Sequence, residues 1–316
     1  MRVFGNTAQG ETVHAIDLSA HGLSATVLTL GGILQDVRLD GIDHSLTLGR
    51  DNLADYEGDY AYFGALVGPV ANRLRDASAR IGGKAYHFEK NENGKTLLHG
   101  GATGLHSKVW NIDKSYENSV TLTVILPDGE GGMPGNRSIE ARYEIAAPGT
   151  LRLTVTAQTD AETLMNVAHH GYWNLDGSDS VAGHELRIAA DHYLPTDKDT
   201  LPTGVIRPVA GGDFDFRDGK PFAPGQPELD HNFCLSRART DLRDVLWLTG
   251  QTGRQMVMAT TEPGVQIFDH RNMDPLYHGL AIEAQVWPDA PNCPGFPDIS
   301  LKPGETCEQV TEWRFS

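Results

Sequence analysis

Leu151-Arg152-Leu153-Thr154-Val155-Thr156 alternates apolar and polar residues over six positions. Because successive side chains of a β-strand point to opposite faces, this stretch predicts a strand that is buried on one face only. The same period of two recurs at residues 120–124, 186–188 and 313–315. Turn residues separate the runs, as in Asp128-Gly129-Glu130-Gly131-Gly132. Half-buried strands joined by such turns are typical of antiparallel sheets.

Long amphipathic helical stretches are scarce, and residues 51–58 are the one segment in which we expect a short helix. Residues 208–230 are rich in Gly, Pro and Asp, and we expect a long ordered loop there instead of a domain linker. All-β folds can reach the length of 316 residues as one unit. We therefore predict an all-β protein, a large, mainly antiparallel β-sandwich, with residues 1–316 forming a single domain.

The composition narrows the classes of partner. The formal net charge is -16 and the sequence pI is about 5.1, which argues against nucleic acid or an anionic membrane as the main partner. No apolar run approaches the roughly 20 residues that span a bilayer, and residues 1–6 do not begin like a signal peptide. The three cysteines are widely spaced and form no disulfide or metal-site pattern, so we expect a cytoplasmic protein.

Two further stretches carry the candidate chemistry, Asn166–Leu175 and Leu280–Gln285. If both are strands, His170 and Tyr172 share a polar face, and His169 lies on the opposite side with Trp173. In the second stretch, Glu283 and Gln285 lie opposite an apolar face. Each strand therefore presents an ionisable group on a polar face, and a histidine with a carboxylate can move protons without a cofactor.

Three other residues are weaker candidates. His99 precedes Gly100-Gly101, where the chain can turn sharply and leave an imidazole at a strand end; a functional role and an incidental one are equally open. Arg73 could hold a carboxylate or a sugar hydroxyl through its planar fork of donors, and Asp230 could accept hydroxyl hydrogens. The plainer interpretations are a surface ion pair or a turn cap for each of these two, and a structural ion pair between Glu283 and Arg73.

Several reaction classes lack their motifs. The sequence contains no G-x-S-x-G nucleophile elbow, no phosphate-binding glycine loop and no H-E-x-x-H metal motif. His99, His170 and Glu283 could in principle form a zinc site, since two histidines and a glutamate are a known ligand set. We nevertheless expect no metal and no other cofactor.

The motifs of the chain, taken in order, resemble those of the aldose 1-epimerases, the galactose mutarotases. Each motif is weak alone, but this many in the right order make chance resemblance very unlikely. The resemblance runs through Tyr62-Phe63-Gly64-Ala65, Ala71-Asn72-Arg73-Leu74, Leu98-His99-Gly100-Gly101, Asp128–Gly131, Pro134-Gly135-Asn136, Asn166–Leu175, Asp230-His231-Asn232-Phe233, Ile282-Glu283-Ala284-Gln285, Pro288-Asp289-Ala290 and Pro303-Gly304-Glu305.

The resemblance implies a galactose mutarotase-like β-supersandwich that interconverts the α and β anomers of free aldoses without metal or nucleotide. Carried over residue by residue, Glu283 resembles the general base, His170 the general acid, and His99 the second histidine at the ring oxygen. Residues in the same motifs are assigned to sugar binding: Arg73, Asn72, Asp230, Gln285 and Tyr172. We also expect Arg73 to keep Glu283 ionised, and a nearby carboxylate to favour the charged form of His170.

The sequence departs from the family pattern at Gly68-Pro69, where many members carry Gly-Arg. The departure leaves the core reaction intact but puts the substrate preference in doubt. Trp287 could stack on a sugar or merely pack, whereas packing is favoured for Trp173.

Two alternatives remain on the same scaffold, a hexose-6-phosphate 1-epimerase and a non-catalytic sugar-binding protein. The first needs a cluster of cations, and the second is expected to have lost the acid or the base. The partner is then a small aldose and the chain a monomer or homodimer. The sequence does not say whether galactose, glucose, arabinose or xylose is preferred.

Overall fold

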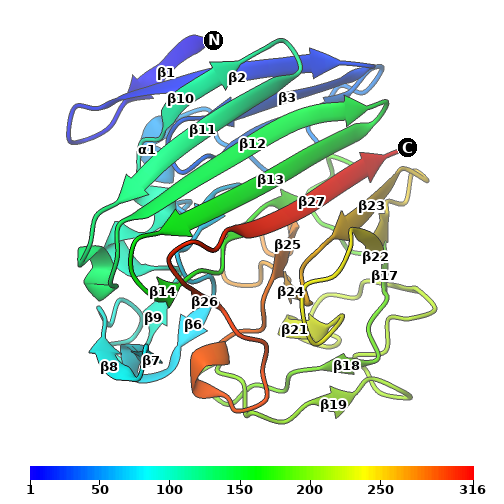
Figure 1. Ribbon diagram of the computed structural model, residues 1–316. Helices are drawn as coiled ribbons and strands as arrows, with labels where there is room; N and C mark the ends of the chain where they lie inside the picture. Colours follow the sequence, from blue (N-terminus) through cyan, green and yellow to red (C-terminus); the bar gives the residue numbers. More distant parts are fainter.

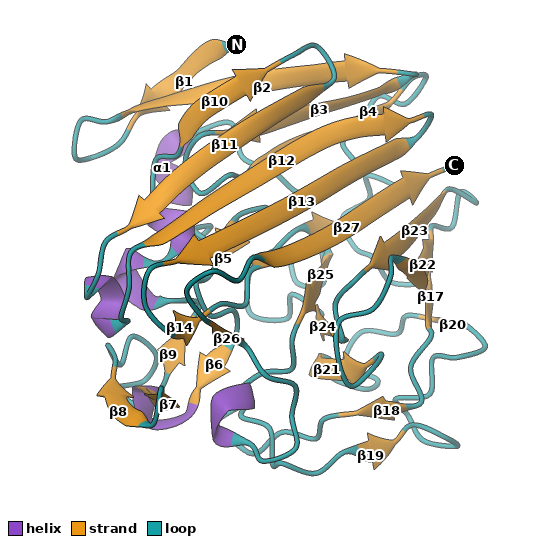
Figure 2. Ribbon diagram, viewed as in Figure 1, coloured by secondary structure: helices purple, strands orange, loops and turns teal.

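The computed structural model describes residues 1–316 and consists mainly of β-strands (Figure 1, Figure 2). Its largest sheet has nine strands, all paired antiparallel, and its long strands cross the upper half of the view in Figure 1. In spatial order these are β10 (Asn111–Ser115), β11 (Ser119–Leu126), β12 (Arg137–Ala147), β13 (Thr150–Thr159), β27 (Cys307–Phe315), β23 (Gln255–Thr260), β22 (Arg243–Thr249), β17 (Glu185–Ile188) and β20 (Lys220–Pro221).

A six-stranded antiparallel sheet carries much of the candidate chemistry. It consists of β16 (Tyr172–Trp173), β25 (Leu280–Gln285), β24 (Gly264–Phe268), β21 (Asp230–Cys234), β18 (His192–Tyr193) and β19 (Arg207–Pro208). A four-stranded sheet near the N-terminus contains β1 (Arg2–Asn6), β2 (Thr12–Ala20), β3 (Leu23–Leu28) and β4 (Leu34–Leu39).

Four two-stranded pairs complete the sheets. They are β5 (Leu66–Val67) with β15 (Ala168–His169), β6 (Arg73–Leu74) with β9 (Leu97–Leu98), β7 (Ser78–Ile81) with β8 (Lys84–His87), and β14 (Thr163–Leu164) with β26 (Ser300–Leu301). The pairs β5–β15 and β6–β9 matter for function, because they set the chain segments that precede His170 and His99.

The only α-helix, α1 (Leu53–Tyr56), lies within the expected segment 51–58 and begins after Asn52, whose side chain accepts from the Ala54 amide. Five short 3-10 turns are the remaining helical structure. The expectation of an ordered loop at 208–230 also holds, because β20 pairs with β17 there and Phe216 and Phe222 are buried in the core. No helix is long and apolar enough to cross a bilayer.

The main hydrophobic core contains 51 buried residues and joins the large sheet to the six-stranded sheet. Leu151, Leu153 and Val155 of β13 contribute to it, as the alternating pattern predicts. Ile267 and Ile282 contribute from the other sheet. The predicted all-β, mainly antiparallel sandwich is therefore confirmed, with one face of the six-stranded sheet packed on the core and the other left for polar groups.

Candidate active site

Strand register gathers polar residues on one face of the six-stranded sheet. Gln266 of β24 lies opposite Glu283 of β25, and Asp230 of β21 lies opposite Phe268 of β24. Directly paired residues project to the same face, and so do residues two positions apart on a strand. Asp230 and Glu283 therefore share this face, although 53 positions of sequence separate them.

The segment before β6 brings a second group of residues to the same place. The Asn166 amide donates to the Pro69 carbonyl at 2.7 Å, and the Asn166 carbonyl accepts from the Ala71 amide at 2.7 Å. Further along, the His170 amide donates to the Ala65 carbonyl at 2.9 Å. These hydrogen bonds lay residues 65–71 beside residues 166–170, so Asn72 and Arg73 reach the side of the sheet where His170 stands.

Asn72 and His99 hold each other by a reciprocal pair of hydrogen bonds. The His99 amide donates to the Asn72 carbonyl at 3.0 Å, and the Asn72 amide donates to His99 Nδ1 at 3.2 Å. Both residues have left-handed backbones, with φ of 60° and 53°. Gly100 follows at φ 82°, where an added Cβ would lie 2.1 Å from the Gly68 carbonyl oxygen. The local chain conformation is thus an uncommon one, of the kind that is concentrated at functional sites.

These segments enclose a polar cavity of about 230 Å³. Seven of the eight sequence-predicted site residues line it: His99, His170, Glu283, Arg73, Asn72, Asp230 and Tyr172. The eighth, Gln285, lies on the same face of β25 but two pairs beyond Glu283, opposite Gly264. It is fully buried and does not line the cavity.

His170 and Glu283 face each other across the cavity, with His170 Nε2 3.6 Å from Glu283 Oε1. Both side chains are buried. Burial raises the pKa of Glu283 to about 8, with the nearby Asp230 charge adding to the rise and Arg73 opposing it. Burial also lowers the pKa of His170 to about 4. The expectation that Arg73 keeps Glu283 ionised is therefore wrong, because desolvation outweighs the Arg73 charge. The expectation that His170 is held in its charged form is also wrong, because burial lowers its pKa.

Burial therefore shifts both groups toward their neutral forms, a protonated Glu283 and an unprotonated His170. The two groups form a neutral acid and a neutral imidazole, not an ion pair. The remaining buried polar atoms of the pair, His170 Nδ1 and Glu283 Oε2, have no hydrogen-bond partner in the protein. Such atoms are expensive to bury alone, so an unpartnered atom on each group is unusual for a protein interior and calls for a functional explanation.

His99 is fixed as a neutral donor. Burial, followed by the charge of His170, lowers the pKa of His99 well below its ordinary value. Because Nδ1 accepts from the Asn72 amide, the single proton of the neutral ring is on Nε2. His99, His170 and Glu283 do present ligand atoms within 4.8 Å of one another. A metal at His99 Nε2 would, however, require the tautomer that the Asn72 hydrogen bond disfavours, so the residues fit a metal poorly.

Arg73 does not pair with Glu283, contrary to the plainer interpretation of the sequence. Its Nε donates to Glu92 Oε2 and one terminal nitrogen donates to Glu92 Oε1, both at 2.8 Å. Glu92 also accepts from the Thr96 hydroxyl at 2.6 Å. Burial by itself would lower the pKa of Arg73, but the Glu92 hydrogen bonds and the neighbouring carboxylates raise it, so the guanidinium stays charged.

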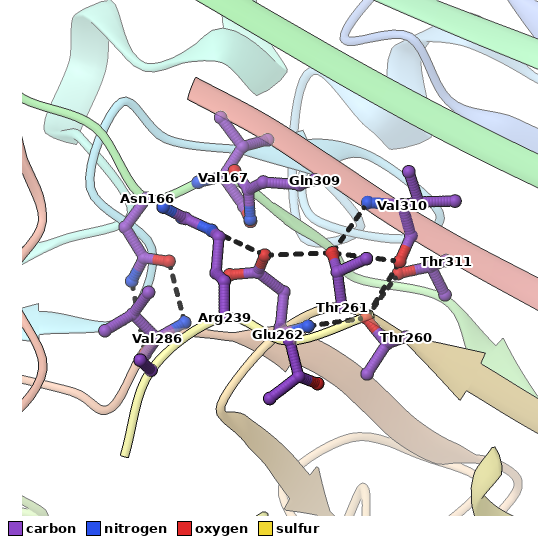
Figure 3. Close-up of polar contacts among 12 residues, drawn as sticks. Asn166, Val167, Arg239, Thr260, Thr261, Glu262, Val286, Gln309, Val310 and Thr311 are labelled. Atoms are coloured by element: carbon purple, nitrogen blue, oxygen red, sulfur yellow. Dashed lines mark hydrogen bonds and ion pairs between the residues drawn. The ribbon is translucent and has the colours of Figure 1, made fainter. Parts of the chain in front are cut away.

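Two buried amide side chains fasten the catalytic segments to each other (Figure 3). The Asn166 side chain accepts from the Val286 amide at 2.9 Å and donates to the Val286 carbonyl at 3.2 Å. The Gln309 side chain of β27 accepts from the Val167 amide at 3.0 Å and donates to the Val167 carbonyl at 2.9 Å. His170 and Glu283 each stand three residues from one of these contacts, so the amides link their segments to the large sheet.

The residues that were expected to pack do so. His169 is buried against Trp313, with ring centroids 4.8 Å apart, on the side away from the cavity. Trp173 is fully buried in the main core. Trp287, for which the sequence left two interpretations, is buried and donates through Nε1 to the Pro263 carbonyl at 2.9 Å, which makes it a packing residue.

Several residues in or beside the cavity wall were not predicted as site residues from the sequence. Gln266 donates to Asp230 Oδ1 at 2.7 Å and so orients that carboxyl group. Tyr62 belongs to a motif noted above, and its ring stacks on His170 at a centroid distance of 5.9 Å. The remaining wall residues missed are Glu92, Leu98, Phe268 and Asn272. The alternation of side chains within β24 could have revealed Gln266, which is a polar residue between Val265 and Ile267. No local pattern in the sequence marks Glu92.

Comparisons with known proteins agree with this geometry. The family described as aldose 1-epimerase matches residues 14–314. The galactose mutarotase of Mus musculus is 35% identical, over 99% of this chain and 97% of the mouse protein. The aldose 1-epimerase of Escherichia coli K12 is 31% identical, over 93% of this chain and 92% of its own length.

Solved structures show the same fold. The aldose epimerase homologue of C. elegans superposes with a TM-score of 0.90 at 31% identity, covering 96% of this chain and 99% of the other. The galactose 1-epimerase of Lactobacillus acidophilus gives a TM-score of 0.86 at 26% identity, covering 99% and 97%.

Sandwich and cavity together define an isomerase that acts on sugars. More narrowly, the chain belongs to the aldose 1-epimerase family and interconverts the anomers of aldoses.

Proposed function

We propose that the cavity is the active site of this anomerisation, with Glu283 as general base, His170 as general acid and His99 assisting at the ring oxygen. The observation that carries the proposal is the facing pair of His170 Nε2 and Glu283 Oε1, 3.6 Å apart, inside a cavity whose wall also contains Arg73, Asp230 and Asn72. A donor and an acceptor of protons so arranged can serve the two oxygens on an anomeric carbon.

The reaction then needs three steps and no cofactor. Glu283 removes the proton from the C1 hydroxyl while His170 gives a proton to the ring oxygen and the C1–O5 bond breaks. The open-chain aldehyde rotates about C1–C2. The C5 hydroxyl attacks the other face of the aldehyde, with His170 taking back its proton and Glu283 returning its proton to O1. Both residues end in their initial state.

The protonation that burial favours for Glu283 and His170 matches the open-chain stage of this reaction. Once the ring has opened, Glu283 is protonated and His170 is neutral, which is the state that burial favours. A cyclic sugar reacts from the other state, in which Glu283 is ionised and His170 carries the proton. Enzymes gain rate by stabilising states along the path more than the substrate.

The remaining polar groups bind the sugar. Arg73 and the Nε2–H of His99 donate to hydroxyl oxygens, while Asp230 and the Asn72 side chain accept hydroxyl hydrogens, and the Tyr172 ring forms part of the wall. Gln285 is retained as a predicted sugar ligand, although this requires movement toward the cavity. At about 230 Å³ the cavity is smaller than the roughly 300–1,000 Å³ of drug-sized sites, which favours a single monosaccharide.

Galactose is the first substrate to test, because the mouse relative is a galactose mutarotase and the Lactobacillus relative a galactose 1-epimerase. A cytoplasmic location is proposed with it, and the three free cysteines suit a reducing compartment. The state of association, monomer or homodimer, stays a prediction.

Polarimetry tests the proposal directly. Freshly dissolved α-D-galactose and α-D-glucose are followed with the wild type, His170→Ala and Glu283→Ala. We expect faster relaxation of optical rotation with the wild type and a loss of about 10²–10⁴-fold in each variant. A folded Glu283→Ala protein with near-normal activity would overturn the base assignment. A wild type that binds galactose without accelerating its relaxation would favour the sugar-binding alternative.

A further inference from the structure

Arg73 is the one basic side chain in the cavity wall, and its charge is already matched. Glu92 takes two of its donors in a bidentate pair, and both bonds measure 2.8 Å. The pair is largely withdrawn from solvent, with side-chain exposures of 13% for Arg73 and 20% for Glu92. The Thr96 hydroxyl, at 2.6 Å from Glu92 Oε2, holds the carboxylate in this orientation.

Guanidinium groups bind phosphate and carboxylate ligands through two parallel N–H donors on one edge of the fork. In this cavity Glu92 occupies the Nε edge of Arg73, and the three remaining N–H donors, two on Nη1 and one on Nη2, have no hydrogen-bond acceptor in the protein. A ligand therefore meets a guanidinium whose Nε edge is taken and whose positive charge is already offset by the Glu92 carboxylate.

No other group in the wall supplies a positive charge to an anion. Asp230 and Glu283 are both carboxyl groups, and burial raises the pKa of each. The two histidines of the wall have lowered pKa values and contribute no positive charge near neutral pH. An anionic sugar would face three carboxyl groups and one arginine that is already paired.

We propose that Glu92 is a specificity-determining residue: by occupying Arg73 it makes the cavity accept neutral aldoses and refuse sugar phosphates and uronates. The inference rests on the proposed function, since it concerns the sugar site described above. It predicts that a hexose 6-phosphate is a poor ligand for this cavity.

The test is the ratio of dissociation constants for D-galacturonate and D-galactose, which differ only at C6, measured by isothermal titration calorimetry. D-galactose 6-phosphate is titrated as a second anion. We expect the wild type to bind either anion at least about 100-fold more weakly than galactose. In Glu92→Gln this ratio should fall at least about tenfold, because the Arg73 charge is released.

Two control variants separate charge from packing. Glu130→Gln removes a carboxylate of the same type that pairs with Lys108 outside the cavity, and so changes the net charge equally. Thr96→Val removes the hydrogen bond to Glu92 but keeps its charge. Both should retain the wild-type ratio, whereas a purely structural role for Glu92 would lower the affinity for galactose and its anionic analogues alike.

The inference is overturned if Glu92→Gln and Glu130→Gln keep the same ratio as the wild type. The inference also fails if the wild type binds galacturonate as tightly as galactose. This outcome needs no variant, so the inference can be tested even if the Glu92→Gln protein misfolds. Binding is measured separately from turnover. An inactive wild type with the expected binding ratios would refute the proposed catalysis alone.

Discussion

At the scale of single residues, folding changes the ionisation of both Glu283 and His170 strongly. Both lie in the same buried cavity, and burial moves their pKa values in opposite directions, to about 8 and about 4. Each shift disfavours the charged form of its own group. Between about pH 4 and about pH 8 the two side chains therefore share one proton, which either of them can hold during the reaction.

The first prediction concerns the pH dependence of activity. The value of kcat/KM reports the ionisations of the free enzyme, so it should be flat between about pH 5 and 7 and fall toward pH 4 and above pH 8. In Glu283→Gln we expect the residual rate, lower by about 10²–10⁴-fold, to lose its basic limb. Polarimetry across the pH range measures both. A basic limb that persists in this variant would assign that ionisation to another group.

The second prediction concerns stability. The pKa of Glu283 rises from an ordinary 4.5 to about 8, so between these values the folded state holds a proton that the unfolded state lacks. Stability from this group is then fully present below about pH 4.5 and is lost as the pH rises through 8. His170, whose folded pKa is depressed from 6.5 to about 4, acts oppositely, and adds stability as the pH rises between these values.

We therefore expect Glu283→Gln to melt at least about 3 °C above the wild type at pH 9 and to lose this advantage below pH 4.5, measured by differential scanning calorimetry. Glu140→Gln, on the exposed face of β12, is the matched control and should melt like the wild type at every pH. A Glu283→Gln protein without any advantage at pH 9 would show that the carboxylate is ionised at little cost.

At the scale of elements, the site depends on contacts that replace ordinary strand pairing. The Asn166 and Gln309 side chains each satisfy one backbone amide and one backbone carbonyl of a neighbouring segment (Figure 3). All four backbone groups belong to buried residues, Val286 and Val167, where an unpaired polar group is costly. These two side chains thus do for the catalytic segments what a sheet ladder does elsewhere.

The third prediction follows from this. Asn166→Ala leaves the Val286 amide and carbonyl unpaired, and should lower the free energy of unfolding by about 2–4 kcal/mol. It should also lower kcat by about tenfold, with little change in KM, because small misplacements of catalytic groups slow the chemical step. Chemical denaturation and polarimetry measure the two effects on the folded fraction.

Gln158→Ala is the control, since this amide is exposed on β13 and donates only to the Thr306 hydroxyl. It should leave both quantities near the wild-type values. If Asn166→Ala lost stability but kept full kcat when folded, the contact would be structural only, with no role in placing His170 and Glu283.

At the scale of the whole molecule, the two principal sheets share one core. The 51 buried residues of this core come from both sheets and from strands of the N-terminal sheet. The fourth prediction is that residues 1–316 unfold as one cooperative unit, as expected of a single domain. Calorimetry should give one transition whose enthalpy agrees with the van't Hoff value, shifted upward by galactose. Two separable transitions would divide the chain into independent parts.

Sequence and structure agree most closely where the signal is local. The alternating runs at 120–124, 151–156, 186–188 and 313–315 lie in β11, β13, β17 and β27, with the apolar members in the core. The short helix and the packed roles of His169 and Trp173 also follow from neighbouring residues, since alternation alone decides which face a strand residue occupies.

By itself, therefore, the sequence determined the all-β class, the sandwich, the family resemblance and seven of the residues that line the cavity. Only the tertiary structure decided the pairing of Arg73 with Glu92, the orientation of Asp230 by Gln266, and the position of Gln285 outside the cavity wall. It also decided that burial raises the pKa of Glu283 and lowers the pKa of His170, which favours the neutral form of each. The physical reason is that periodicity is a property of adjacent residues, whereas ion pairing and desolvation depend on groups that the chain brings together from distant positions.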